Sequence, residues 1–361
     1  MKIGIIGGGA SGILSALLLK KAHPKWEVTI YEANDRIAQK ILKTGNGRCN
    51  LGHSGITAKD YPFDLTKQLT IFNEDVFINT FKELGIFVFK DEEGRYYPES
   101  ESSKQVVSIL LNQLERYHVE IKTNKAIASI EDKNNYYIID HNRYDAVIIA
   151  TGGKSQSEYN GSDIFKELKI KTIPYQPALV GLKTVENIKA LSGIRRKVNV
   201  KAVNFEEAGE VQFKDEGVSG IVVMNYSRVV QKGDVFTLDL APHYSKADLK
   251  DLLKEHNKEE IVNGLFPKSL ATYLLKEKDL ILAIKEFKLT VKDTYSFKEA
   301  QISLGGVDLK EINEYFEAKA YPHLYILGEA LNNDGACGGY NLYFAWLSSY
   351  IACLDIDKKM R

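Results

Sequence analysis

The first 32 residues constrain the fold more than any other stretch of this chain. Residues 2–6 have the apolar composition of a short buried strand, and Gly7, Gly9 and Gly12 follow at the spacing G-x-G-x-x-G. Residues 10–18 then place apolar side chains on one face of a helix. A second strand, residues 27–32, ends in an acidic residue. This order of strand, glycine turn, helix, strand and acid predicts a nucleotide-binding unit of the Rossmann type.

Each part of this unit has a physical role toward a dinucleotide. Gly7 permits the tight turn, Gly9 lets a pyrophosphate approach bare backbone, and Gly12 lets the helix pack close to the strand. The first helical turn directs N–H groups and the positive end of the helix dipole at the phosphates. Glu32 can accept hydrogen bonds from both hydroxyls of an adenosine ribose. The expected binding residues here are Gly7, Gly9, Ala10, Ser11, Gly12 and Glu32.

Composition and charge exclude several other classes of protein. Lys plus Arg and Asp plus Glu both number 48, so no net field attracts nucleic acid or an anionic membrane. No stretch reaches the roughly 18 apolar residues of a membrane helix. The three cysteines contain no C-x-x-C pair and the histidines are scattered, which predicts neither a disulfide framework nor a metal site. We expect a cytoplasmic protein that acts on a small molecule, with no nucleic-acid or membrane partner; the oligomeric state stays open.

Two later strands are expected to reach the same nucleotide. Residues 145–150 form an apolar run that ends in Thr151 and Gly152, as in a central parallel strand whose carboxyl end faces a ligand crevice. Residues 324–327 form another, followed by Gly328 and Glu329. FAD is long enough to span the domain, and Glu329 could accept from a ribityl hydroxyl. An enzyme that binds only a nicotinamide cofactor does not need this second motif.

The middle of the chain predicts a different architecture. Short alternating segments, among them residues 198–203, 209–213 and 221–224, read as strands of a barrel-like unit. Ser245 and Asp248 have the spacing of a capping box that starts a helix. We therefore predict an α/β fold: a discontinuous Rossmann-like FAD-binding domain (residues 1–178 and 298–361), an inserted β-rich domain (179–243 and 285–297) and a helical subdomain (244–284).

Five spaced motifs resemble a bacterial family of FAD-dependent oxidoreductases that includes aminoacetone oxidase and the bile-acid-inducible flavoprotein reductase. Residues 40–50 resemble the family's K-x-x-x-S-G-x-G-R-C-N, with Thr44 for serine. The other four are residues 94–100, 209–220, 300–307 and 328–341, in which Tyr97 replaces phenylalanine, Lys214 and Asp215 replace Thr-His, and Asn332 replaces an Asp. Residues 155–159 replace the family's proline-bearing continuation after Thr-Gly-Gly.

The resemblance implies a set of site residues and a cofactor, FAD. The further cofactor-binding residues are Lys40, Gly45, Gly47, Arg48, Cys49, Asn50, Ala126, Thr151, Gly152, Gly328, Glu329, Gly338, Gly339, Tyr340 and Asn341. Tyr97 and Cys337 are expected in the substrate pocket. The alternative for residues 45–50 is a plain surface turn. Cys49 and Cys337 in flavin-side loops allow a redox-active thiol, although such cysteines are more often small packed residues.

The functional prediction is an FAD-dependent oxidoreductase that moves a hydride between flavin N5 and a small organic substrate or NAD(P)H. The chain has one dinucleotide fingerprint, so NAD(P)H would dock transiently. Oxidases and NAD(P)H-dependent reductases both occur in the family, and the sequence identifies neither the direction nor the catalytic residues. Two alternatives stay open: a flavin-free NAD-dependent dehydrogenase, and a dinucleotide-binding protein without catalytic activity.

Overall fold

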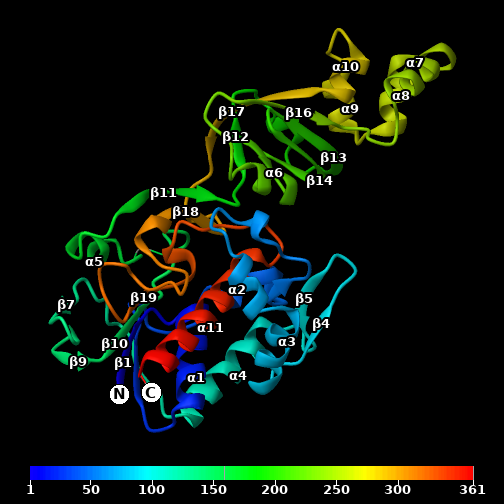
Figure 1. The fold of residues 1–361 in the computed structure, drawn as a ribbon. Helices are drawn as coiled ribbons and strands as arrows, with labels where there is room; N and C mark the ends of the chain where they lie inside the picture. The colour runs from blue at the N-terminus through cyan, green and yellow to red at the C-terminus, as the bar shows by residue number, and fades with distance from the viewer. Residues whose placement is uncertain (158, 361) are drawn as a thin grey trace. The chain divides into compact units, whose positions relative to one another are not determined.

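The computed structural model describes residues 1–157 and 159–360 and contains two compact units. The first unit comprises Met1–Gln176 and Ser303–Arg361, and the second comprises Pro177–Ile302. Figure 1 shows the first unit with both ends of the chain in it, blue and red. The finer division, with residues 244–284 as a subdomain of their own, stays a prediction.

A parallel five-stranded sheet forms the centre of the first unit. Its order is β19-β10-β1-β2-β6, and every neighbouring pair is parallel. The strands are β1 (Lys2–Ile6), β2 (Glu27–Tyr31), β6 (Glu120–Lys122), β10 (Ala146–Ile149) and β19 (Leu324–Ile326). Ile3, Ile5 and all four residues of β10 are fully buried, which explains their continuous apolar runs. Strands from both ends of the chain thus build one sheet, as predicted.

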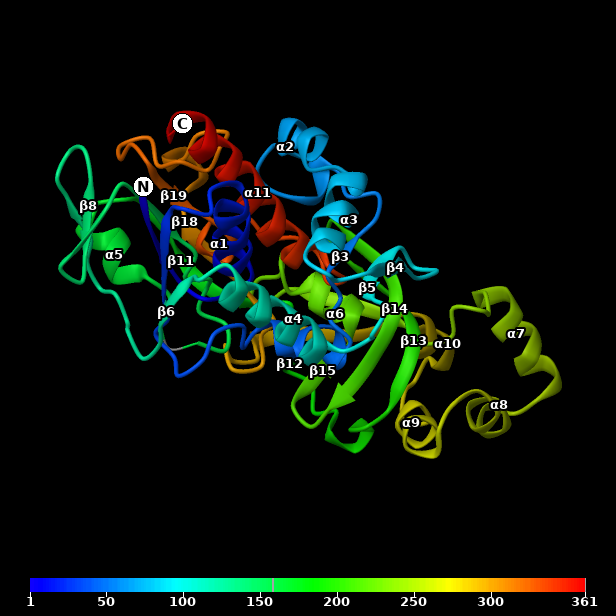
Figure 2. The same cartoon turned by 90° about the horizontal axis from the view of Figure 1, so that it is seen from below.

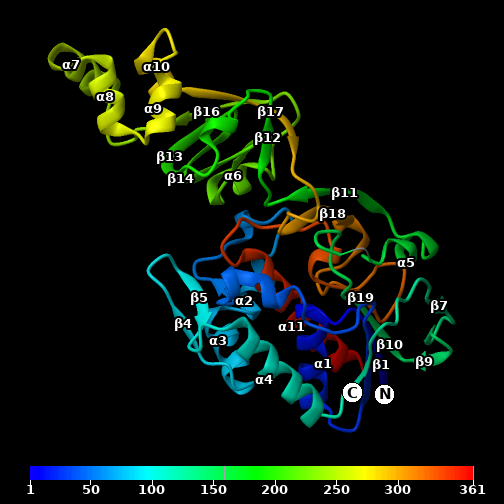
Figure 3. The same ribbon diagram turned by 180° about the vertical axis from the view of Figure 1, so that it is seen from behind.

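Two helices from opposite ends of the chain pack against each other in the first unit. They are α1 (Ala10–Ala22) and α11 (Tyr340–Met360), blue and red in Figure 3. Small side chains let them approach: Ser11 Oγ donates to Ala345 O (3.1 Å), and Ser349 Oγ donates to Ser11 O (2.9 Å). This contact keeps the glycine turn and the last helix in one body.

The remaining elements of the first unit surround this core. The helices are α2 (Thr66–Ile71), α3 (Glu74–Glu83), α4 (Ser103–Arg116) and α5 (Ser162–Glu167), with 3₁₀ turns at Ile41–Gly47, Ala58–Asp60, Leu309–Glu311 and Gly328–Ala330. The strands are β3 (Gly52–His53), β4 (Val88–Lys90), β5 (Arg95–Pro98), β7 (Glu131–Asp132), β8 (Tyr137–Ile139), β9 (Asn142–Tyr144), and the pair β11 (Thr172–Ala178) and β18 (Ile302–Val307).

The second unit is built on a closed barrel of order β12-β15-β14-β13-β16-β17. Its strands are β12 (Leu182–Thr184), β13 (Arg195–Ala202), β14 (Phe205–Lys214), β15 (Gly217–Ser219), β16 (Val235–Asp239) and β17 (Phe287–Thr294), with a 3₁₀ turn at Lys189–Leu191. Figure 2 shows β13 and β14 as a long curved hairpin. The predicted α/β class, with a Rossmann-like sheet and an inserted barrel, is confirmed.

The prediction of a strand at residues 221–224 is wrong, because Ile221–Tyr226 forms helix α6. Gly220 has φ of +110°, and a Cβ there would lie 2.1 Å from Glu210 O. After β15 the backbone therefore takes a conformation that favours glycine. Met224 N then donates to Gly220 O at 2.8 Å, which is a bond of the first turn of α6. The two valines that suggested a strand, Val222 and Val223, are fully buried, so their residue type reflects burial and not extended backbone.

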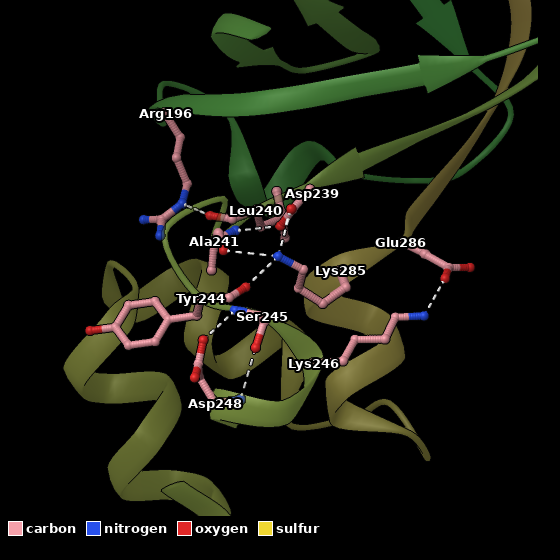
Figure 4. A network of polar contacts seen from close by, with 10 residues as sticks. All are labelled: Arg196, Asp239, Leu240, Ala241, Tyr244, Ser245, Lys246, Asp248, Lys285 and Glu286. Carbon is pink, nitrogen blue, oxygen red and sulfur yellow. Dashed lines mark hydrogen bonds and ion pairs between the residues drawn. The ribbon is translucent and has the colours of Figure 1, made fainter. Parts of the chain in front are cut away.

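Four helices lie between β16 and β17: α7 (Lys246–Glu255), α8 (Lys258–Leu265), α9 (Lys268–Leu274) and α10 (Leu280–Lys285). The predicted capping box at the start of α7 is confirmed: Ser245 Oγ accepts from Asp248 N, and Asp248 accepts from Ser245 N. Figure 4 shows the contact between the end of α10 and the end of barrel strand β16. Lys285 Nζ lies 2.6 Å from Asp239 Oδ2 and 3.2 Å from Ala241 O, with 12% and 17% of the two charged side chains exposed.

Within the described residues, no helix combines the length and apolar character that crossing a membrane requires.

Candidate cofactor site

Four parallel strands place their following residues on one edge of the sheet. Gly7 follows β1, Glu32 follows β2, Thr151 comes two residues after β10, and Glu329 comes three residues after β19. Because these strands are parallel, their carboxyl ends share that edge, where open α/β sheets bind ligands.

The glycine turn after β1 contains two positions that the protein itself requires. Gly7 has φ of +109°, and a Cβ on it would lie 2.2 Å from Ala150 O. A Cβ on Gly12 would lie 2.0 Å from Gly7 O, so helix α1 could not pack on this turn. Both glycines have the structural roles that the sequence predicts.

Gly9 differs, because nothing in the protein requires a glycine there. Its φ is −85°, and a Cβ on it would meet no atom within 4 Å. It is the N-cap of α1, whose first turn has no acidic residue and no side-chain cap. Bare backbone with open space beside Gly9 therefore lies at a helix end whose first N–H groups have no acceptor within the helix, which fits an approaching phosphate.

Glu32 is held against the glycine turn. Its carboxylate accepts from Gly8 N at Oε2 (2.9 Å) and from Asn34 N at Oε1 (2.9 Å), and the residue is 8% exposed. Asn34 Nδ2 also donates to Oε1 (2.6 Å), so three of the roughly four lone-pair sites of the carboxylate are used and one, on Oε2, remains. The position and the remaining capacity suit a ribose.

Glu329 joins three distant segments of the chain. Its Oε2 lies 2.9 Å from Lys40 Nζ, and its Oε1 accepts from Ser303 N (2.9 Å) and Ser155 Oγ (3.1 Å). Lys40 Nζ also donates to Ser155 Oγ at 2.9 Å. Lys40 and Glu329 were predicted as site residues, but Ser155 was missed. The signal for it was the unusual stretch that follows Thr151-Gly152-Gly153.

The two glycine-rich loops lie against each other. A Cβ on Gly339 would lie 2.5 Å from Gly52 O and 2.8 Å from Asn50 Oδ1, and one on Gly45 would lie 2.7 Å from Asn50 N. Asn341 closes the second loop by accepting from Gly335 N (2.9 Å). Residues 45–50 therefore form a packed loop in contact with residues 335–341, beyond what a plain surface turn requires.

Arg48 and Tyr97 form one stack, although they were predicted for cofactor and substrate respectively. The guanidinium carbon lies 4.2 Å from the centre of the ring, and Arg48 also pairs with Glu101. Tyr97 is 5% exposed and Arg48 Nε is a buried donor that has no partner among the described residues. The stack leaves that donor available to a ligand.

The buried cysteines do not have the character of reactive thiols. Cys49 is fully buried, and burial raises the pKa of its thiol to about 11. Burial likewise raises the pKa of Cys353 to about 12. A thiol of this kind is protonated at neutral pH, which argues against a redox role for Cys49. Cys337 is half-buried in the loop before α11.

The other predicted residues take these positions. Ala10 and Ser11 begin α1, Gly328 (φ +60°) contacts Ser11 Oγ, and Gly47 (φ +88°) and Gly338 (φ +117°) lie in the two glycine-rich loops. After β10, Thr151 Oγ1 donates to Asn160 O (3.1 Å), and the Cβ direction of Gly152 (φ +71°) points toward Lys40 Nζ. The ring of Tyr340 stacks on His53 at 4.9 Å, and the exposed Ala126 follows Lys125, whose N donates to Glu32 O (2.8 Å). The described residues contain no group of three or more His, Cys, Asp or Glu side chains able to hold a metal ion.

Comparison with known proteins gives both a family and a fold. The model described as the HI0933-like protein Rossmann domain matches residues 1–355. The 3-dehydro-bile acid delta(4,6)-reductase of Clostridium scindens is 32% identical over 97% of this chain and 98% of its own length. A ribosomal RNA dihydrouridine synthase of Haemophilus influenzae is 26% identical over 98% of both chains, and one of Escherichia coli is 25% identical over 98% and 97%.

Among solved structures, the FrdA subunit of Escherichia coli quinol fumarate reductase matches with a TM-score of 0.51. The match covers 99% of this chain and 70% of that one at 11% identity, so it supports the fold alone.

Proposed function

The chain belongs to the HI0933-like Rossmann-domain family, and we propose that it is an FAD-dependent reductase acting on a carbon–carbon double bond conjugated to a carbonyl group. The family membership confirms the resemblance carried by the five motifs. The observation that best supports the cofactor is Gly9, a glycine at a helix N-terminus that faces open space and has an ordinary φ.

The residues of the first unit fit FAD as follows. The turn from Gly7 to Gly12 and the N-terminus of α1 would bind the pyrophosphate, and Glu32 would accept from the adenosine ribose. Glu329, fixed by Lys40 and Ser155, would accept from the ribityl chain. FAD, when bound, supplies the two-electron hydride chemistry that amino-acid side chains lack.

The last helix would tune the charge on a ring bound before it. α11 begins at Tyr340 after two glycines with positive φ, and its first turn contains no acidic residue. Its N-terminal dipole is therefore not neutralised within the helix and favours negative charge nearby. This arrangement supports electron uptake by the cofactor without a cationic side chain.

The relatives support reduction of an activated double bond. The name of the Clostridium scindens protein describes a bile acid with a carbonyl at C3 and reducible bonds at C4 and C6. Dihydrouridine is uridine with its C5–C6 bond saturated, and that bond is conjugated to the C4 carbonyl. Both names thus describe saturation of a carbon–carbon double bond conjugated to a carbonyl group. For this chain we propose that the step is hydride addition to such a bond, with NAD(P)H as the electron donor.

Anaerobic rapid mixing tests this proposal. NADH or NADPH is expected to bleach the flavin band at about 450 nm, and a 3-oxo-4-ene steroid is expected to restore it. Bleaching by an amine, with rapid reoxidation by oxygen and none by the enone, would instead identify an oxidase.

A second candidate substrate is a uridine in ribosomal RNA, because two relatives with this printed activity match nearly the whole chain. The balance of 48 basic and 48 acidic residues provides no net attraction for RNA. Reoxidation of the reduced protein by an unmodified rRNA fragment, and not by the steroid, would favour this candidate.

The same mixing experiment tests the two remaining alternatives. A flavin-free dehydrogenase would show no flavin band, and a non-catalytic binder would show a flavin band that no donor bleaches.

A further inference from the structure

Two buried tyrosine hydroxyls in the first unit have no hydrogen-bond partner within residues 1–157 and 159–360. The hydroxyl oxygens of Tyr159 and Tyr175 are inaccessible to solvent, and no described residue bonds to either. A buried hydroxyl without a partner loses its bonds to water without replacement, so such groups are uncommon and call for a physical reason. A role in binding a ligand that accepts from the hydroxyl is one such reason.

Tyr159 lies in the segment that follows strand β10. Ser157 Oγ donates to Tyr159 O (2.6 Å), and Thr151 Oγ1 donates to Asn160 O (3.1 Å), which fastens this segment to the end of the β10 strand. The adjoining residue Ala150 contacts Gly7, since a Cβ on Gly7 would lie 2.2 Å from Ala150 O. Tyr159 is thereby held on the Gly7 side of the sheet edge.

Tyr175 lies in β11, beside β18, and Ser303 of β18 donates a hydrogen bond to Glu329. β11 pairs with β18, and a Cβ on Gly305 of β18 would lie 2.4 Å from Pro174 O. Ser303, also in β18, donates its N–H to Glu329 Oε1 at 2.9 Å. Tyr175 therefore belongs to the Glu329 side of the site.

Each of these hydroxyls lies within electrostatic reach of one of the two site carboxylates. Burial, followed by the charges of Asp163 and Glu32, raises the pKa of Tyr159. Burial, followed by the charge of Glu329, raises the pKa of Tyr175. Both hydroxyls keep their protons at neutral pH and can donate a hydrogen bond.

We propose that Tyr159 and Tyr175 are cofactor-binding residues, whose hydroxyls donate hydrogen bonds to the adenosine ribose and the ribityl chain respectively. Each sugar portion then meets a carboxylate that accepts and a tyrosine that donates. This pairing rests on the proposed FAD function. The pairing extends the site to residues outside the five motifs, because Tyr159 and Tyr175 both lie between the motifs at residues 94–100 and 209–220.

Three Tyr→Phe variants of the full chain test the pairing. Tyr159→Phe and Tyr175→Phe remove the two unpartnered hydroxyls. The control, Tyr137→Phe, removes a buried hydroxyl that does have a partner, Pro322 O at 2.7 Å. Calorimetric titration of the flavin-free proteins gives the affinity for FAD, and competition gives the affinity for ADP, which lacks the ribityl chain.

The three variants have different expected results. Tyr159→Phe weakens both FAD and ADP by roughly five- to tenfold, and Tyr175→Phe weakens FAD by a similar factor with ADP unchanged. Tyr137→Phe leaves both affinities unchanged and lowers the melting temperature of the flavin-free protein, because it breaks an existing bond. The other two variants leave that melting temperature equal to or above the wild-type value, because they remove an unsatisfied group.

Wild-type affinity for FAD and ADP in both Tyr159→Phe and Tyr175→Phe would overturn the pairing. Failure of the wild-type chain to bind FAD at all is a separate result, and it would overturn the proposed function.

Discussion

Replacing Gly9 by Asp is expected to move protein stability and cofactor affinity in opposite directions. Gly9 caps α1 with extended backbone, and a Cβ at this position meets no protein atom within 4 Å. Asp is a favourable N-cap residue, and its charge also complements the helix dipole. Without the cofactor, the variant should therefore be about 0.5–1 kcal/mol more stable toward unfolding.

The same carboxylate would lie in the space assigned to the pyrophosphate. Two like charges about 5 Å apart repel by about 3 kcal/mol at an effective dielectric constant of about 20. This energy corresponds to a loss of roughly a hundredfold or more in FAD affinity. Gly9→Asn is the matched control, because it has nearly the same bulk and capping ability without the charge.

Urea unfolding of the flavin-free proteins and calorimetric titration with FAD measure the two effects. We expect the Gly9→Asp protein to be more stable than the wild type, and the affinity for FAD to fall in the order wild type, Gly9→Asn, Gly9→Asp. An Asp variant that binds FAD within threefold of wild type would refute the placement of the phosphates at this turn. A Gly12→Ala protein should instead lose its fold, since the added Cβ would lie 2.0 Å from Gly7 O.

Two further predictions concern charge and thiol chemistry. Lys285→Met leaves Asp239 largely buried without its partner and should lower the free energy of unfolding by about 3 kcal/mol. Lys246→Met breaks the exposed pair with Glu286 and should cost less than about 1 kcal/mol. Equal losses in urea unfolding would contradict a stabilising role for the buried Lys285–Asp239 pair. With a pKa of about 11, Cys49 is a thiolate in only about one molecule in a thousand at pH 8. Iodoacetamide should therefore not label it in the folded protein until the pH approaches 11. Rapid labelling at pH 8, measured by mass spectrometry, would contradict the burial of this thiol.

The sheet and its ligand edge could be predicted because local sequence determines them. Continuous apolar runs identify strands buried on both faces, and the glycines after β1 report a turn that admits no Cβ. Glu32 directly follows β2 and Glu329 comes three residues after β19, so strand polarity places both on one edge. The capping box at Ser245 is equally local, since its two bonds lie within three residues.

Contacts between distant segments could not be predicted in the same way. Ser155 reaches Lys40 and Glu329 only after three segments fold together, and no periodicity reports that contact. Residues 221–224 were misassigned because valine-rich composition describes burial as well as extended backbone. The hydroxyls of Tyr159 and Tyr175 become conspicuous only in the folded structure, where no described residue bonds to either of them.

The most direct test of the central claim is a calorimetric titration of the purified, flavin-free chain with FAD, repeated in the presence of ADP. We expect saturation at one FAD per chain, with ADP competing, because the glycine turn and Glu32 would hold the adenosine diphosphate portion that the two ligands share. A chain that takes up no FAD, or that binds FAD without competition from ADP, would contradict it.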